Sequence, residues 1–281
     1  LSFTPLLPKF SFCCRWLNWG NLALSLLFAA GALYAGVKVP VVKNVHIPSE
    51  RLAREYTVVV LSDLHIHRVI NPQKIERIVS LANARNPDVV LLAGDIIDDD
   101  VRRVSKITAL LKGLKASKGI YFVTGNHEFY AGYDETVREL ANLGFMFLEN
   151  DGAAVGEDLY LAGVPDTFAG AAYGKTPDLN RAFAKAGKGA FRLLVSHTPS
   201  DFAGRDFDLE VSGHTHGGLI LPVTPLIAAF NGGYVRGPYT VDGMPLYVSS
   251  GSGLWGGIPL RLFVPSEITL ITLTGTGFDT N

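Results

Sequence analysis

The sequence is poor in cysteine and nearly balanced in charge. Its only two cysteines, Cys13 and Cys14, are adjacent, so they cannot build a disulfide framework or a structural zinc site of the cysteine type. The 25 basic and 26 acidic residues leave a formal net charge of -1. Proteins that bind nucleic acid through its phosphates normally carry an excess of positive charge. We therefore expect no nucleic acid partner.

One long run of mostly apolar residues near the N-terminus, Asn21 to Val37, has no charged residue. Arg15 precedes the run and Lys38 follows it. About 17 to 25 apolar residues span a bilayer, and tryptophan at one end, here Trp16 and Trp19, is typical of the membrane interface. The run therefore predicts a membrane anchor, with a buried core helix as the alternative. The basic residues on its two sides balance, so they do not predict which side of the membrane holds the rest of the chain.

Beyond this run, the chain alternates apolar strands with helical patterns. Five times a predicted strand ends in polar residues, in the segments Thr57–His65, Asp88–Asp95, Ile120–Glu128, Phe191–Pro199 and Leu209–Gly218. Apolar residues at helical spacing predict helices between them, the first opening at Asn71-Pro72. This order is typical of layered α/β folds, in which ligands bind at the carboxyl ends of strands. If the strands lie side by side, their polar ends converge.

The converging ends would bring together two aspartates, one asparagine and five histidines: Asp63, Asp95, Asn126, His65, His127, His197, His214 and His216. Imidazole, carboxylate and amide ligands suit divalent Mn, Fe or Zn. Eight candidate groups exceed what one ion can use, so we expect two divalent metal ions that share a carboxylate. Two-metal sites clamp phosphoryl oxygens and lower the pKa of a water between the ions. The pattern therefore predicts hydrolysis at phosphorus.

The segment VSGHTHGG, Val211 to Gly218, places two of these histidines one residue apart. On a regular strand such neighbours would point to opposite faces of the sheet. We expect Gly213, Gly217 and Gly218 to supply the backbone conformations that turn both side chains toward the same metal pair.

The blocks SDLH, GDIID, GNHE, VSHTP and GHTHGG, in this order, resemble the calcineurin-like metallophosphoesterase superfamily over roughly Thr57 to Leu273. The resemblance implies a four-layer αββα sandwich of two mixed β-sheets flanked by helices. It places a metallophosphoesterase domain at 57–281, behind an N-terminal anchor region at 1–40 and a linker with an edge strand at 41–56. Because the sequence begins with leucine, we expect residues upstream, and these can include further membrane helices.

The resemblance also implies a role for each residue. Asp63, His65 and His216 would bind the first metal, Asn126, His197 and His214 the second, and Asp95 would bridge them. His127 would not bind metal but would act as the catalytic residue, donating to the phosphoryl oxygen or protonating the leaving group. Glu128 would orient its neighbours.

Some residues near the motifs depart from the family pattern. The protein phosphatases of the superfamily have arginines where this chain has Asp99 and Thr124, so protein phosphatase activity is not expected. We interpret Asp98 to Asp100 as a solvated loop or as support for Asp95, and His67 as a residue of the site's rim. Arg68 and Arg236 are candidates to bind a substrate phosphate.

The C-terminal stretches YVSSGSG and PLRLFVPSEITLITL resemble a branch of bacterial membrane-associated phosphoesterases that includes a UDP-diacylglucosamine hydrolase. Together with the anchor, this favours an enzyme of the bacterial cytoplasmic membrane that cleaves a phosphoester or pyrophosphate bond of a lipid-linked nucleotide. The apolar stretch Val223–Tyr239 either lines a groove for such a substrate or belongs to the core. The alternatives are a broad-specificity phosphodiesterase for small soluble substrates, a nuclease, which the charge disfavours, and a non-catalytic metal-binding scaffold.

Overall fold

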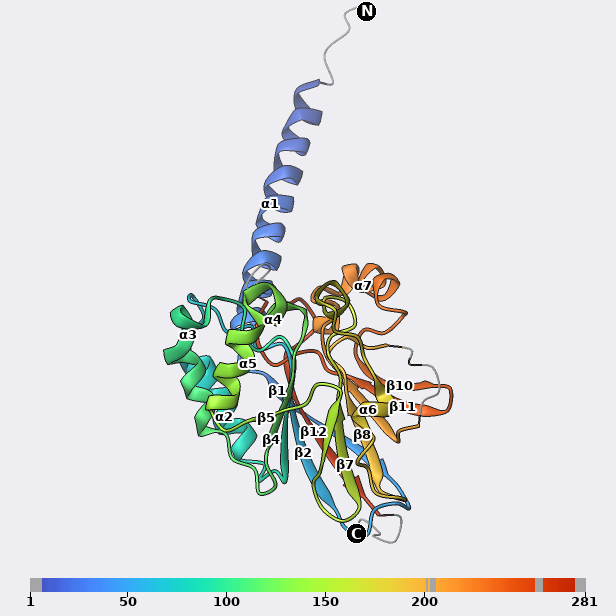
Figure 1. Cartoon of the computed structure of the whole chain (residues 1–281). Helices are drawn as coiled ribbons and strands as arrows, with labels where there is room; N and C mark the ends of the chain where they lie inside the picture. Colours follow the sequence, from blue (N-terminus) through green and yellow to red (C-terminus); the bar gives the residue numbers. More distant parts are fainter. Residues whose placement is uncertain (1–6, 201, 203–205, 256–259, 276–281) are drawn as a thin grey trace, which may run out of the picture.

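A computed structural model describes residues 7–200, 202, 206–255 and 260–275, with side chains from residue 18 onward. The chain begins with α1 (Leu7–Val37), which projects away from the rest of the molecule (Figure 1). Its segment Asn18–Val37 is long and apolar enough to cross a membrane, and only 11% of it is buried. This exposure argues against the core-helix alternative. The side chains of Cys13, Cys14 and Trp16 lie outside the described part.

The first of two six-stranded sheets has the order β1-β12-β2-β3-β4-β5. Its strands are β1 (Val41–Pro48), β2 (Tyr56–Leu61), β3 (Val89–Ala93), β4 (Ile120–Val123), β5 (Met146–Phe147) and β12 (Glu267–Thr274). The pairing of β12 with β2 is antiparallel and the other pairings are parallel, so the sheet is mixed. The predicted edge strand within 41–56 is present as β1.

The second sheet has the order β10-β11-β9-β8-β7-β6 and is also mixed. Its strands are β6 (Asp151–Ala154), β7 (Leu159–Gly163), β8 (Phe191–Val195), β9 (Leu209–Ser212), β10 (Gly237–Val241) and β11 (Met244–Val248). The short strands β5, β6 and β10 were not predicted, because segments of two to five residues give little periodicity.

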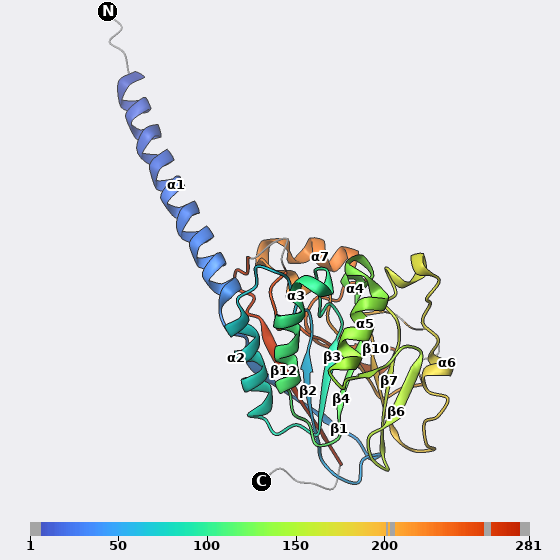
Figure 2. The ribbon, with the colours of Figure 1, turned by 60° about the vertical axis from the view of Figure 1, so that its left-hand side comes forward.

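Alternating side chains of the central strands enter two different cores. Val58 and Val60 of β2 pack between the two sheets, against Leu193 and other residues of the second sheet. Val59 and Leu61 point the other way, toward the helices that cover the first sheet. These helices are α2 (Pro72–Asn83), α3 (Val101–Thr108) and α5 (Tyr133–Asn142) (Figure 2). Burial on both faces explains why β2 reads as one continuous apolar run.

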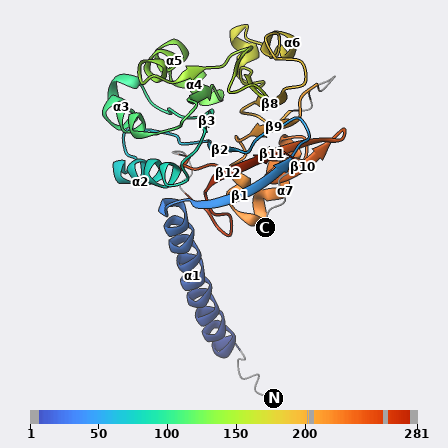
Figure 3. The same ribbon diagram turned by 90° about the horizontal axis from the view of Figure 1, so that it is seen from below.

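A thinner layer covers the outer face of the second sheet. There α6 (Leu179–Ala182) packs on a small core that includes Tyr160 and Leu194. The predicted fold class, two mixed sheets flanked by helices with an additional N-terminal apolar helix, is confirmed. Figure 3 shows this body from below, with α1 leaving it on one side.

Capping residues set where the helices begin. The Asn71 side chain accepts a hydrogen bond from the Gln73 amide, and Pro72 occupies the first turn, as the sequence predicted. α3 begins at Val101, because the Asp100 carboxylate accepts from the Arg102 amide and caps it. α4 (Asn126–Ala131) starts directly after β4, so the predicted strand Ile120–Glu128 is too long at its end.

Candidate metal centre

The polar ends of five strands meet at one edge of the molecule, but the strands belong to two sheets. β2, β3 and β4 of the first sheet supply residues through 128, while β8 and β9 of the second supply the remainder. The predicted convergence of the strand ends is present. The five strands do not all lie side by side, because they are divided between the two sheets. The metal-ligand candidates at these ends are buried, except His214, which is half-buried.

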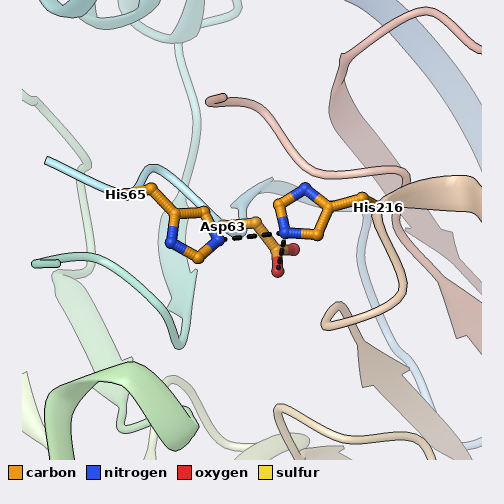
Figure 4. A group of neighbouring side chains, drawn as sticks. All are labelled: Asp63, His65 and His216. Carbon is orange, nitrogen blue, oxygen red and sulfur yellow. Dashed lines mark hydrogen bonds and ion pairs between the residues drawn. The ribbon is translucent and has the colours of Figure 1, made fainter. Parts of the chain in front are cut away.

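Asp63, His65 and His216 form the first cluster, in which one ligand atom from each lies within 4.8 Å of the others (Figure 4). The Nε2 atoms of His65 and His216 are 3.0 Å apart, and His216 Nε2 is 3.6 Å from Asp63 Oδ1. The loops after β2 and after β9 thus bring residues 151 positions apart into contact. These are the three residues that the resemblance assigns to the first metal.

A second cluster contains Asp95, His197 and His214. His197 Nε2 lies 3.2 Å from Asp95 Oδ2, and Asn126 Oδ1 lies 2.9 Å from His214 Nδ1. Asp95 Oδ2 is also 3.7 Å from His65 Nε2 of the first cluster. Asp95 therefore stands between the two clusters, where the sequence placed the bridging residue.

The donor atoms of these clusters fit divalent cations. His197 donates its Nδ1 hydrogen to the Ala93 carbonyl at 2.8 Å and turns its Nε2 toward Asp95 Oδ2, 3.2 Å away. Burial alone would lower the pKa of His197, but Asp95 raises it well above its usual value, so a cation bound there would take the place of this proton. Burial, with a smaller effect from His65, lowers the pKa of His216 well below its usual value. A neutral imidazole is the form that binds metal.

The charge of Asp95 is also suited to this environment. Burial alone would raise the pKa of the Asp95 carboxyl, but His197, His65 and His127 around it hold that pKa far below its usual range. Asp95 is therefore ionised at neutral pH, and a buried anion surrounded by imidazoles is a site for cations.

Strained backbone accompanies the ligand candidates. Asp63, His65, Asp95, His214 and His216 all have a positive φ, between 46° and 69°. Such conformations are uncommon outside glycine and cluster at functional sites, where the surrounding structure over-determines them. The expectation for VSGHTHGG therefore needs a correction: the two histidines themselves, together with Gly217 and Gly218, adopt the left-handed conformation.

Gly213 serves the site in a different way from the one predicted. Its φ is not positive, but a Cβ atom there would lie 1.8 Å from Ser62 Oγ and 2.6 Å from Asp63 Oδ2. The backbone of β9 therefore passes closer to Asp63 than any side chain would permit, and the His214 amide donates to Asp63 Oδ1 at 3.1 Å.

We expect Gly213→Ala to destabilise the fold by about 1–3 kcal/mol, as overpacking does, and to weaken metal binding because Asp63 must move. Thermal unfolding and metal titration measure the two effects. Gly187→Ala is the matched control, because nothing lies within 4 Å of a Cβ at Gly187. Equal behaviour of the two variants would contradict the close-approach role.

His127 lies on α4 beside the two clusters and, with His65 and Asp98, forms a third group whose ligand atoms lie within 4.8 Å of one another. Its amide donates to Asp95 Oδ1 at 2.9 Å, its Nδ1 hydrogen-bonds to Asp98, and its side chain is 19% exposed. Burial alone would lower the pKa of His127, but the hydrogen bond to Asp98 and the nearby carboxylates raise it above its usual value. Its Nε2 lies 3.9 Å from Asp95 Oδ2.

Asp98 is a site residue whose contacts the sequence did not predict. It neither lies in a solvated loop nor supports Asp95: it hydrogen-bonds to His127, and its Oδ2 is 3.3 Å from His65 Nδ1. Asp98 closes the GDIID block three residues after Asp95, but this position in the sequence does not show which residues its side chain contacts. One carboxylate thus orients a histidine of the metal cluster and the neighbouring His127.

We expect Asp98→Asn to lower the hydrolysis rate about 10- to 100-fold, the usual cost of losing such an orienting partner. Steady-state kinetics with a chromogenic phosphodiester measure it. Asp100→Asn is the control, since Asp100 caps α3 and pairs with Arg102 at the surface. A loss in the control as large as in Asp98→Asn would point to general damage of the loop.

Two further buried charges shape the site. Glu128 accepts hydrogen bonds from the amides of Asp95, Ile97 and other residues of the β3 and β4 ends, which confirms its predicted orienting role. Arg261 was not singled out from the sequence. It is fully buried and donates to the His216 carbonyl at 3.2 Å and to the Ser250 carbonyl at 2.8 Å, so it supports the backbone of a ligand candidate.

A cavity of about 220 Å³ opens over the clusters. Its polar wall includes Asp95, His127 and His214, and its other wall includes Ile227 and Trp255. The two arginine candidates do not line it: Arg68 is exposed and paired with Asp99 at 3.2 Å, and Arg236 donates to the Gly217 carbonyl. His67 does not line the cavity either: it is half-buried, and its Nδ1 hydrogen-bonds to the His65 carbonyl.

Comparisons with known proteins agree with this geometry. The chain is 33% identical to an uncharacterized metallophosphoesterase of Helicobacter pylori, over 90% of this chain and 68% of that protein. It is 34% identical to a transmembrane protein with metallophosphoesterase domain of Danio rerio, over 90% of this chain and 61% of that one. Among solved structures it is similar to the Haemophilus influenzae NAD nucleotidase, with a TM-score of 0.47 and 16% identity, over 71% of this chain and 45% of that one. Residues 56–218 match the family model of the calcineurin-like phosphoesterases, and the chain belongs to this family.

Proposed function

We propose that this metallophosphoesterase is anchored in the bacterial cytoplasmic membrane and hydrolyses a phosphoester or pyrophosphate bond of a lipid-linked nucleotide such as UDP-diacylglucosamine. The observation that carries the hydrolytic part is the convergence of two histidine and carboxylate clusters on one cavity. The membrane-length helix α1 supports the anchored part. So does the description of the Danio rerio relative as a transmembrane protein.

In this proposal two divalent ions, manganese first with iron or zinc as alternatives, bind at the two clusters. Asp63, His65 and His216 hold one, and Asn126, His197 and His214 hold the other. Asp95, whose carboxylate approaches histidines of both clusters, is shared. Ions bound there would neutralise phosphoryl oxygens and lower the pKa of water near phosphorus.

The chain's own groups do the remaining work. Asp98 accepts the hydrogen bond of His127 Nδ1, which leaves Nε2 on the side of the ring away from Asp98. From there His127 donates a hydrogen bond to a phosphoryl oxygen or a proton to the leaving group, and the carboxylates that raise its pKa favour the protonated ring that this role needs. The Trp255 ring, whose centroid is 6.5 Å from that of His127, lines the cavity beside this position.

The substrate class is tested by comparing UDP-diacylglucosamine in mixed micelles with a soluble chromogenic phosphodiester, using manganese-loaded protein. The proposal expects kcat/KM to be higher for the lipid substrate. A preference for the soluble diester would favour a broad-specificity phosphodiesterase that α1 merely localises. No turnover of either substrate by protein that retains its metal would favour a metal-binding scaffold.

A further inference from the structure

A short uncharged helix beside the cavity leaves its large apolar side chains in solvent. Neither α7 (Thr224–Phe230) nor the 3₁₀ turn before it, Leu221–Val223, has a buried residue. Leu221, Val223, Leu226 and Phe230 are 48%, 39%, 57% and 80% exposed, and we call these four side chains the α7 face. The sequence did not decide whether Val223–Tyr239 lines a groove or belongs to the core. Within this stretch, α7 does not belong to the core. Exposed apolar patches mark interaction surfaces.

The α7 face is joined to the base of α1 by a short chain of hydrogen bonds. The Arg261 amide donates to the Ala32 carbonyl of α1 at 3.1 Å. The next residue, Leu262, donates to the Leu219 carbonyl at 3.0 Å and accepts from the Leu221 amide at 3.2 Å. Figures 1 and 3 accordingly place α7 on the side of the domain from which α1 leaves.

The end of α1 is docked on the domain rather than loosely tethered. Ala32 and Gly36 are buried, and the ammonium group of Lys74 donates to the Gly36 carbonyl at 2.9 Å. The sheet begins at Val41, soon after α1 ends at Val37. The junction between α1 and the first sheet is therefore short and held by a hydrogen bond from the domain.

The same helix forms part of the cavity wall. Leu226 and Phe230 are four residues apart, so they lie on one side of α7. Ile227 and Asn231 are displaced from them by one residue, about 100° around the helix, and these two line the cavity with His127 and His214. α7 thus has one side toward the candidate metal centre, while the side that carries Leu226 and Phe230 is exposed.

We propose that the α7 face inserts into the interfacial region of the bilayer that α1 crosses, so that the cavity opens at the level of the lipid headgroups. Lipid is the occupant because the patch is uncharged and continuous with the base of a membrane-length helix. Interfacial helices bury their apolar side chains about 5–10 Å into the headgroup and acyl boundary. The inference rests on the proposed membrane anchoring and deepens it: substrate phosphates reach the site along the membrane surface.

The test places an environment-sensitive nitrobenzoxadiazole probe on single cysteines in the full chain, with Cys13 and Cys14 replaced by serine. The protein is reconstituted in phosphatidylcholine vesicles with or without doxyl-labelled lipid. Probes at Leu226→Cys and Phe230→Cys are expected to emit at shorter wavelength and to be quenched by the doxyl lipid. Leu27→Cys in α1 is the positive control, and Lys185→Cys, at a side chain 69% exposed, is the control in water.

Each outcome decides a separate point. Quenching at Leu27 but water-like emission at both α7 positions would overturn the inference while membrane anchoring stands. A blue-shifted but unquenched probe on α7 would mean that protein, not lipid, covers the face, and would overturn it as well. Absence of quenching at Leu27 would overturn the anchoring itself and the inference with it.

A second measurement links the α7 face to turnover. The double variant Leu226→Ser, Phe230→Ser is expected to hydrolyse UDP-diacylglucosamine in vesicles about tenfold more slowly, because the substrate's phosphates no longer meet the cavity at the interface. Its rate on the soluble diester should be unchanged. Met146→Ser, at an exposed apolar residue of β5, is the matched control. An equal loss on both substrates would contradict the inference.

Discussion

His127→Ala should retain its bound metal and lose hydrolysis by about 10²- to 10⁴-fold, the usual contribution of a general acid or base. The reason is geometric: the ring is held by Asp98, outside the two predicted ligand sets, and it reaches the cavity from α4. Elemental analysis of the purified protein and kcat on a chromogenic diester measure the two halves of the expectation.

The matched control is His46→Ala, because His46 is an exposed histidine of β1. Loss of metal in His127→Ala would make His127 a ligand and would contradict its assignment. Unchanged turnover would contradict its catalytic role. Because the His127 amide still donates to Asp95 in the alanine variant, the backbone around the clusters should stay in place.

Local sequence pattern was sufficient to predict the positions of the central strands and of their polar ends. The apolar runs that became β2, β3 and β8 are buried on both faces, so their composition is decided by burial alone. The small polar and glycine residues after them mark where each strand stops. The apolar runs and the polar residues after them together predicted which side chains gather around Asp95.

What the sequence could not predict depends on contacts between distant segments. The proximity of Asp98 to His65 and the burial of Arg261 behind His216 arise from loop packing, which has no period. The role of Gly213 could not be told from that of Gly217, because close approach and left-handed backbone both select glycine. The exposure of α7 could not be predicted either, since an apolar stretch of sequence can lie in a core or on an exposed surface.

Asp95→Asn should remove the metal pair's shared anion and lower hydrolysis on the order of 10³-fold, beyond the roughly 10- to 100-fold expected for an orienting partner. The amide has the same shape, so the hydrogen bond from the His127 amide to this side chain survives and the fold is kept. The lost charge, however, is the one that His197 approaches at 3.2 Å and His65 at 3.7 Å.

Metal stoichiometry and kcat, measured with and without a chelator, test this expectation. Chelation should inactivate the wild type to the level of the variant and change the variant little. Asp99→Asn, which weakens the ion pairs of Asp99 with Arg68 and Arg103 but changes neither cluster, is the control and should behave as the wild type. If Asp95→Asn kept both ions and most of its activity, Asp95 would not be the bridging ligand, and the two clusters would have to act as separate sites.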